Sequence, residues 1–169
     1  MGLQVDAQNW LGDLYDRHGA GVYRYLAVLL GRKEDAEDVM QTIFVKLARN
    51  PDRLGGILDP QAYLFAAARN EGMSLLRKRS RKEKREVELE AADYLIDRNN
   101  PSASQDELQE LNRALQRLSP EQRETVALHT FEAMTFDEIG RLFGLSVNTV
   151  VSRYRLGLKK LKKVWKREQ

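Results

Sequence analysis

Four carboxylates lie close together in the sequence, at Glu34, Asp35, Glu37 and Asp38. Such a cluster could in principle hold a magnesium ion in an enzyme that acts on phosphates. On one helix, however, the four side chains point to different sides, and no glycine-rich phosphate loop or nucleophile–base pair accompanies them. The chain has no cysteine and only two histidines, which are far apart. We therefore expect no enzyme activity, no catalytic residue, no metal site and no cofactor.

The charged residues are unevenly distributed along the 169-residue chain, although its formal net charge is only +3. Residues 77–85 hold seven bases and one acid, residues 86–110 hold eight acids and one base, and residues 153–169 hold eight bases and one acid. Two basic blocks around an acidic one would allow a polyanion to be bound at two places. Each block could equally be a solvated surface, so charge alone does not decide for nucleic acid.

Nothing in the sequence predicts insertion into a membrane or export. No apolar run approaches the roughly 20 residues that a membrane-spanning helix needs. The N-terminus lacks the basic stretch and apolar core of a signal peptide. We therefore expect a soluble, cytoplasmic protein without disulfides.

Apolar residues in the N-terminal half recur at three- and four-residue spacing, which predicts helices. The first stripe, which Gly31 should end as a C-cap, consists of Trp10, Leu11, Leu14, Tyr15, Val22, Leu26, Leu29 and Leu30. The second consists of Ala36, Val39, Met40, Ile43, Phe44 and Leu47. Residues 50–59 predict an irregular loop, and Asp59 and Pro60 should start a third helix. Strand-type alternation is absent, so the predicted fold class is all-α.

A change of composition divides the chain. The stretch before residue 106 is acidic, and residues 99–104 (NNPSAS) are a run of helix breakers. We predict two small helical domains, at 1–82 and 107–169, joined by a flexible acidic linker at 83–106.

The second domain carries the signals of a helix-turn-helix. Two capping boxes should start helices, one formed by Ser119 with Gln122 and the other by Thr135 with Glu138. Gly144 fits a left-handed C-cap, and Ser146 caps another helix two residues later. Gly140 should allow the two helices to approach closely. A short helix, a glycine turn and a second helix form the DNA-binding pattern; a helical hairpin without DNA binding is the alternative.

The last helix should have an apolar inner stripe and a polar outer face. The expected inner residues are Val147, Val150, Tyr154, Leu158 and Leu161. The expected outer residues are Asn148, Thr149, Ser152, Arg155 and Lys159, with Arg153 at the edge. Short polar groups near the start of the helix suit base edges, and cations farther along suit phosphates.

The second predicted helix suits a different partner. With its apolar stripe buried, Glu34, Asp38, Gln41 and Val45 line up on the outside. This acidic stripe would repel DNA and fits a protein with a basic groove. An ordinary solvated helix face is the alternative.

These motifs together resemble bacterial RNA polymerase sigma factors. Residues 35–44 (DAEDVMQTIF) look like the DAEDxxQxxF helix of that family, and residues 60–77 (PQAYLFAAARNEGMSLLR) resemble its promoter-melting segment. Residues 119–124 (SPEQRE) and 145–150 (LSVNTV), with Ser152 and Arg153, are similar to its C-terminal promoter-binding region. The two-domain form resembles the extracytoplasmic-function (ECF) subgroup.

The resemblance implies that the first domain binds core polymerase and opens the −10 element, and that the second reads the −35 element. The implied −35 contacts are Asn148, Thr149, Ser152, Arg153, Arg155 and Lys159. The implied −10 contacts are Asn50, Arg53, Tyr63, Arg69, Asn70, Arg77 and Lys78. The implied core-binding residues are Glu34, Asp38, Gln41, Thr42 and Val45. The implied partners are a coiled coil of the largest polymerase subunit, the flap of the second-largest subunit, promoter DNA and an anti-sigma factor.

The chain departs from the family pattern at a few positions. Ser74 stands where an aspartate is frequent, Gly72 interrupts the same helix, and Tyr63 replaces a tryptophan. We assign Phe65 to the core and leave Tyr63 open between the core and stacking on unpaired bases. An autonomous helix-turn-helix repressor or activator is the alternative function, although the first domain shows no obvious dimer seam or ligand pocket.

Overall fold

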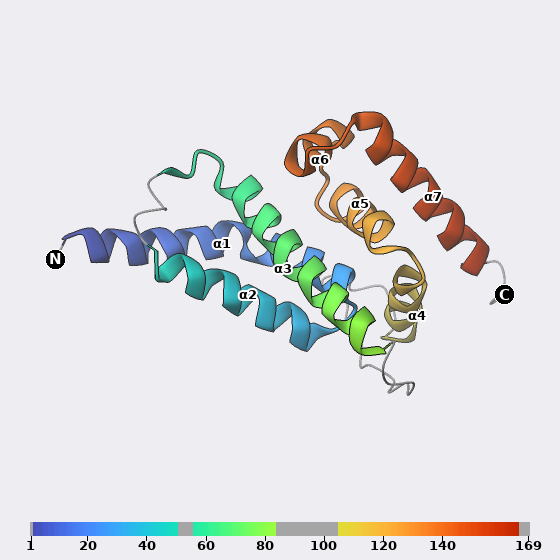
Figure 1. Ribbon diagram of the computed structural model, residues 1–169, viewed down its shortest axis with the longest axis horizontal. Coiled ribbons are helices and arrows are strands. Elements are labelled where there is room, and N and C mark those ends of the chain that lie inside the picture. Colours follow the sequence, from blue (N-terminus) through green and yellow to red (C-terminus); the bar gives the residue numbers. More distant parts are fainter. Residues whose placement is uncertain (1, 51–55, 84–104, 166–169) are drawn as a thin grey trace.

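The computed structural model describes residues 2–50, 56–83 and 105–165, which form seven α-helices and no strand. The helices are α1 (Gly2–Leu30), α2 (Lys33–Ala48), α3 (Pro60–Glu83), α4 (Gln105–Gln116), α5 (Pro120–Thr130), α6 (Phe136–Phe143) and α7 (Val147–Trp165). The predicted all-α class is confirmed. Helices α1–α3 lie together, and α4–α7 form a second group beside them, with α7 at its outer edge (Figure 1). None of the described helices is both long and apolar enough to cross a membrane.

The predicted helix starts are confirmed by hydrogen bonds. Both capping boxes are complete, at Ser119 before α5 and at Thr135 before α6. The side chains of Asp59 and Ser146 accept backbone N–H bonds, of 2.9 and 3.1 Å, at the starts of α3 and α7. These oxygens satisfy donors that the first turn of a helix leaves without an internal partner.

Glycines shape the turns as predicted. Gly31 and Gly144 follow α1 and α6 with φ of 74° and 64°, in the left-handed region that favours glycine. Gly140 faces the turn of the helix-turn-helix, where a Cβ atom would lie 2.8 Å from the carbonyl oxygen of Leu145. A side chain at residue 140 would therefore push the turn away from α6.

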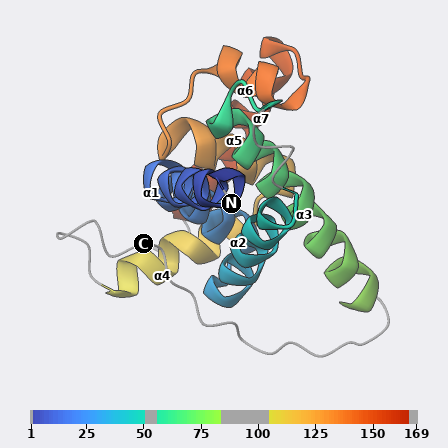
Figure 2. The same cartoon turned by 90° about the vertical axis from the view of Figure 1, so that its left-hand side faces the viewer.

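One apolar core extends through both helix groups. Its largest fully buried apolar side chains are Tyr25, Phe65, Leu26, Leu29, Leu64, Leu115, Leu128 and Ile139. The assignment of Phe65 to the core is confirmed, and its ring meets that of Tyr25 edge-on at 5.7 Å. Helix α1 packs against α2 and α3 of its own group and against α5 of the second group, as the view along α1 shows (Figure 2). The two predicted domains are thus packed together, while most of the predicted linker lies outside the described residues.

Gly72, one of the departures from the family pattern, lies where α3 packs on α1. A Cβ atom at this position would lie 3.0 Å from Leu29 Cδ2 and 3.4 Å from Leu26 Cδ2. The missing side chain therefore allows these two helices to approach closely.

Three residues expected in apolar stripes are exposed, so those predictions are wrong. Tyr15 is 56% exposed; its ring meets that of Phe44 edge-on, and both residues line a groove. Val147 and Leu158 are 42% and 41% exposed. The buried residue near Leu158 is Gly157, which packs against Val126. The inner stripe of α7 therefore follows Val150, Tyr154, Gly157 and Leu161.

Candidate functional site

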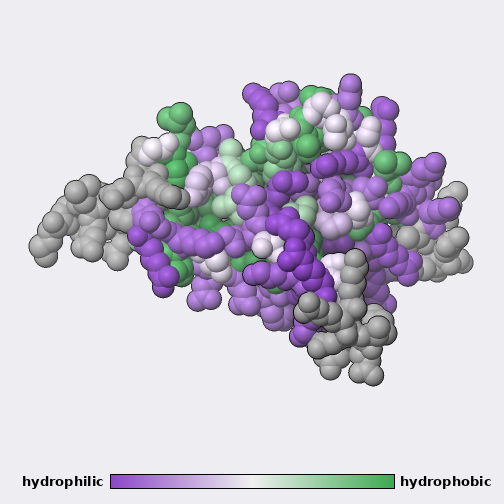
Figure 3. Space-filling model, viewed as in Figure 1, coloured by the Kyte–Doolittle hydropathy of each residue, from purple (hydrophilic) through white to green (hydrophobic). Residues whose placement is uncertain are grey.

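The outer face of α7 presents the polar residues that the sequence predicts. Asn148, Ser152, Arg155 and Lys159 are all exposed. The edge of the molecule formed by α7 is largely hydrophilic (Figure 3). This face has short polar groups near the start of the helix and cations farther along, which suits a helix that enters the major groove.

Two other candidate residues of α7 are held by neighbours. Thr149 is partly buried, and its hydroxyl lies 2.8 Å from that of Ser146, within the cap. Arg153 is also partly buried, and its Nη1 donates to Glu124 Oε1 of α5 at 3.3 Å. Arg155 is thus the more accessible of the two candidate arginines.

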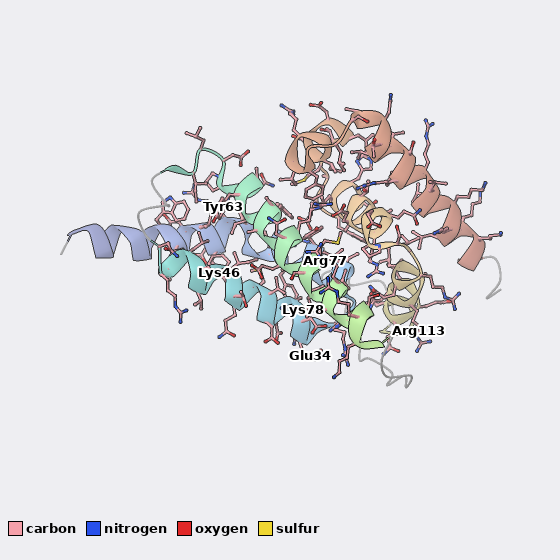
Figure 4. All side chains as sticks on the ribbon, in the orientation of Figure 1. Glu34, Lys46, Tyr63, Arg77, Lys78 and Arg113 are labelled. Atoms are coloured by element: carbon pink, nitrogen blue, oxygen red, sulfur yellow. The ribbon has the colours of Figure 1, made fainter. Side chains whose placement is uncertain are left out.

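The acidic stripe of α2 faces outward as predicted. Glu34, Asp38, Gln41 and Val45 are exposed, and Val45 is an apolar residue with 40% exposure. Thr42 is exposed and its hydroxyl donates to the Asp38 carbonyl at 2.9 Å. Figure 4 shows Glu34 and Lys46 towards the two ends of α2.

A largely apolar groove of about 960 Å³ lies beside this stripe, between α1 and α2. Its lining includes Tyr15, Met40, Phe44 and Val45, with Asp16, Glu37 and Gln41 among its polar residues. An apolar groove next to acidic side chains can bind an amphipathic segment that carries cations.

Two acids of the cluster in α2 have basic neighbours. Asp35 forms an ion pair with Arg79 of α3, and a Glu37 oxygen lies 3.5 Å from Lys33 Nζ. Within the described part of the chain, no group of three or more acids and histidines is arranged to hold a metal ion.

Most of the candidate −10 residues lie along α3. Tyr63 is 37% exposed near the start of α3, and Arg77 and Lys78 are exposed near its other end (Figure 4). The exposure of Tyr63 favours the interpretation that its ring stacks on unpaired bases rather than packing in the core. Asn70 is exposed, and the amide of Asn50 donates to the Lys46 carbonyl at 3.0 Å. Arg53 lies outside the described residues.

Arg69, the remaining candidate −10 contact, faces the second helix group. Its Nε and Nη2 donate to the two carboxylate oxygens of Glu124, at 2.7 and 3.2 Å. Its guanidinium also lies over the ring of Phe143, 4.5 Å from the centroid. The Glu124 side chain is completely buried, so it depends on Arg69 and Arg153 for its charge partners.

Burial raises the pKa of Glu124 above its ordinary value of 4.5, and the hydrogen bond and charge of Arg69 act in the opposite direction. The folded protein therefore holds this proton more tightly than the unfolded chain does. The contribution of Glu124 to stability is fully present below pH 4.5 and is lost as the pH rises through the raised pKa.

We predict that the stability of the wild-type protein relative to Glu124→Gln falls as the pH rises from below 4.5 towards neutrality. Glutamine has nearly the same shape but does not titrate. Urea unfolding of both proteins at a series of pH values measures the difference. A difference that is constant or grows with pH would contradict the direction of this pKa shift.

The C-terminal end of α1 is also held by the second helix group. Gln116 Nε2 donates to the Val28 carbonyl at 2.9 Å, and Asn112 Nδ2 donates to the Gly31 carbonyl at 3.3 Å. Arg123, which is buried, donates to the Leu29 carbonyl. The last carbonyls of a helix lack partners within it, so these side chains act as a cap supplied from outside.

The sequence analysis did not predict these polar contacts between the two helix groups. Arg24 forms a two-bond ion pair with Glu132 at 3.0 Å, although 108 residues separate them. Arg69 and Glu124 are 55 residues apart. No local spacing signals such contacts, because they depend on how the helices pack.

Comparisons with known proteins identify the family of this chain. Residues 14–82 match the family model for Sigma-70 region 2, and residues 108–161 match that for Sigma-70 region 4. The chain is 30% identical to the RNA polymerase sigma factor CarQ of Myxococcus xanthus, over 94% of this chain and 90% of CarQ. This chain belongs to the ECF group of RNA polymerase sigma factors.

Two further similarities concern this sigma factor. It is 28% identical to the ECF sigma factor SigL of Mycobacterium tuberculosis H37Rv, over 88% of this chain and 85% of SigL. Its fold is similar to that of the sigma factor RpoE of Bartonella quintana, solved in complex with the anti-sigma factor NepR. The TM-score is 0.71 and the identity 24%, over 93% of this chain and 99% of RpoE. As a sigma factor, the protein directs RNA polymerase to promoters and initiates transcription.

Proposed function

We propose that this sigma factor reads the −35 element through the outer face of α7. The observation that carries the proposal is the exposure of Asn148, Ser152, Arg155 and Lys159 on one face of a capped helix. Asparagine and arginine can form paired hydrogen bonds to adenine and guanine, respectively, and Lys159 can contact a phosphate. The partly buried ion pair of Arg153 with Glu124 supports a positioning role for Arg153 in α7.

Replacing Arg155 with alanine tests this assignment. If Arg155 reads a base, the change should weaken promoter binding by about 1–3 kcal/mol and relax the preference at one −35 position. Lys160→Ala is the matched control, because it also removes an exposed cation from α7 but on another side of the helix. The affinity of the holoenzyme for promoters with altered −35 elements measures both effects. Equal effects of the two substitutions would contradict base reading by Arg155.

We propose that α2 docks on a coiled coil of the largest polymerase subunit, through Glu34, Asp38, Gln41, Thr42 and Val45. The exposed acids supply charge opposite to a basic surface, and Val45 supplies an apolar contact. The adjoining groove between α1 and α2 would extend this interface. The flap of the second-largest subunit is the corresponding proposed partner of the second domain.

We further propose that α3 and the loop before it bind the −10 element. The support is the exposure of Tyr63, Asn70, Arg77 and Lys78 along one helix. An exposed aromatic ring can stack on an unpaired base, and the two cations can bind phosphates. This would place promoter opening in the first domain.

An anti-sigma factor is the proposed regulator of this protein, which we expect to act in the cytoplasm and without catalytic activity. The Bartonella quintana relative was solved with such a partner. An anti-sigma factor that covered α2 and its groove would compete directly with core polymerase.

The dependence of promoter binding on core polymerase distinguishes a sigma factor from an autonomous repressor. Alone, the protein should bind duplex promoter DNA weakly, because each domain offers a small contact area. With core enzyme, the two domains would be held at a fixed spacing and binding should strengthen. Transcription from a genomic DNA library with reconstituted enzyme tests this proposal. A specific high-affinity footprint from the protein alone, without polymerase-dependent transcripts, would favour the repressor.

A further inference from the structure

One apolar side chain lies within the polar face of α7 that is proposed to read the −35 element. Leu156 is 52% exposed, which is the largest exposed fraction among the large apolar side chains described on this helix. At about 100° per residue, it lies about 40° around the helix from Ser152 and about 60° from Lys159. Both of these side chains are exposed, so Leu156 is a neighbour of two groups that should face the DNA.

The surroundings of Leu156 fit nucleic acid better than a protein partner. The other exposed apolar side chains of α7, Val147 and Leu158, lie about 180° and about 160° from it around the helix axis. The side chains three and four residues from it are one serine, one arginine and two lysines: Ser152, Arg153, Lys159 and Lys160. A protein partner generally requires a contiguous apolar patch, whereas cations around a single apolar group attract the phosphates of DNA.

Contact with DNA would remove the Leu156 side chain from water, and the group that it meets decides whether this is favourable. Most of the base edges in the major groove are hydrogen-bond donors and acceptors. An apolar side chain that covers such a group removes its water without supplying a partner, which costs free energy. Thymine is the exception, because its C5-methyl group also points into the major groove. The complementary surface for Leu156 is therefore a thymine methyl group.

We propose that Leu156 is a specificity-determining residue that selects thymine at one position of the −35 element through its C5-methyl group. Asn148 and Arg155 would select bases by hydrogen bonds, whereas Leu156 selects one by an apolar contact. The −35 element must then contain at least one A·T pair. The inference rests on the proposed function, because it requires that this face of α7 enters the major groove.

Deoxyuridine tests the proposal directly, because it pairs as thymidine does and lacks only the C5-methyl group. The probe is a duplex promoter identified from the transcripts of the reconstituted enzyme. Each thymine of its −35 element, on either strand, is replaced in turn with deoxyuridine, and the affinity of the holoenzyme is measured by competition with the unmodified duplex. The wild type should lose about fourfold in affinity at one of these positions, the factor that corresponds to one buried methyl-sized group. A thymine in the spacer beyond the element is the DNA control and should show no effect.

Substitutions in α7 then connect the thymine methyl group to Leu156. Leu156→Ala should bind the unmodified promoter more weakly than the wild type and should not respond to deoxyuridine at the sensitive position. Leu158→Ala is the matched control, because it removes an exposed leucine from a different side of the same helix, and it should respond as the wild type does. Leu156→Met keeps an apolar side chain of similar volume and should retain the response. Circular dichroism checks that all three variants are folded.

The proposal is overturned if no −35 thymine responds to deoxyuridine in the wild type, or if Leu156→Ala retains the full response. A −35 element that contains only G·C pairs would overturn it as well. Failure of the proposed function gives a different result, namely that Arg155→Ala leaves the affinity for every promoter variant unchanged. A normal effect of Arg155→Ala without any response to deoxyuridine therefore rejects the role of Leu156 alone.

Discussion

Replacing both Asp38 and Gln41 with arginine should abolish binding to core polymerase and leave the melting temperature close to that of the wild type. Both side chains are exposed on α2, opposite the buried Val39 and Ile43. Two new cations facing a basic surface could cost several kcal/mol of binding free energy. Exposed substitutions usually change stability by no more than about 0.5 kcal/mol. A pull-down with core enzyme and circular dichroism measure the two effects.

The matched control introduces the same change in charge elsewhere in the first domain. Asp13 on α1 and Gln61 on α3 are also exposed, and their replacement with arginine should leave core binding intact. The proposed DNA-binding face of α7 should be unaffected in both double variants. Normal core binding by the Asp38→Arg, Gln41→Arg protein would show that the acidic stripe is only a solvated helix face.

Replacing Arg123 with methionine should cause a large loss of stability. Arg123 is 5% exposed and donates to the carbonyls of Leu115, Gln116 and Leu118. It also donates to the Leu29 carbonyl in the first domain. Burial lowers its pKa to about 10, so the side chain is charged at neutral pH.

Methionine fills similar space but donates no hydrogen bond, and each buried polar group left without a partner costs about 1–3 kcal/mol. We expect a loss of about 3 kcal/mol or more, which corresponds to a fall in melting temperature on the order of 10 °C. Arg123→Lys should recover little of this loss, because one ammonium group cannot replace the guanidinium fork. Arg113→Ala on α4 is the control, since Arg113 is exposed. Near-native melting of Arg123→Met would contradict this account.

The local features of this protein followed from its sequence. The capping boxes at Ser119 and Thr135, the glycine turn at Gly144 and the outward face of α2 all appear where the residue spacing predicts them. Each feature depends on interactions within a few residues or on the 3.6-residue period of one helix, so residue spacing is sufficient to predict it. The same motifs carried the resemblance to sigma factors.

The wrong predictions concern residues whose burial depends on how the neighbouring helices pack. The sequence pattern placed Leu158 in the inner stripe of α7, whereas the structure buries Gly157 against Val126. The periodicity of apolar residues does not identify a glycine at a helix contact, because glycine contributes by leaving space for the neighbouring side chain. Tyr15 likewise matches the stripe of α1 but lies at the edge of a groove.

Only the tertiary structure determined that the two domains pack together and which polar groups join them. Sequence composition predicted a flexible connection, and neither the partner of Arg69 nor the role of Arg123 was foreseen. Their contacts with Glu124 and Leu29 join residues 55 and 94 positions apart. Such pairs form because helix packing brings buried donors and acceptors to the same place, where each must find a partner away from water. The sequence thus determined which polar and charged groups each helix carries, and the packing determined which of them are exposed and which are paired.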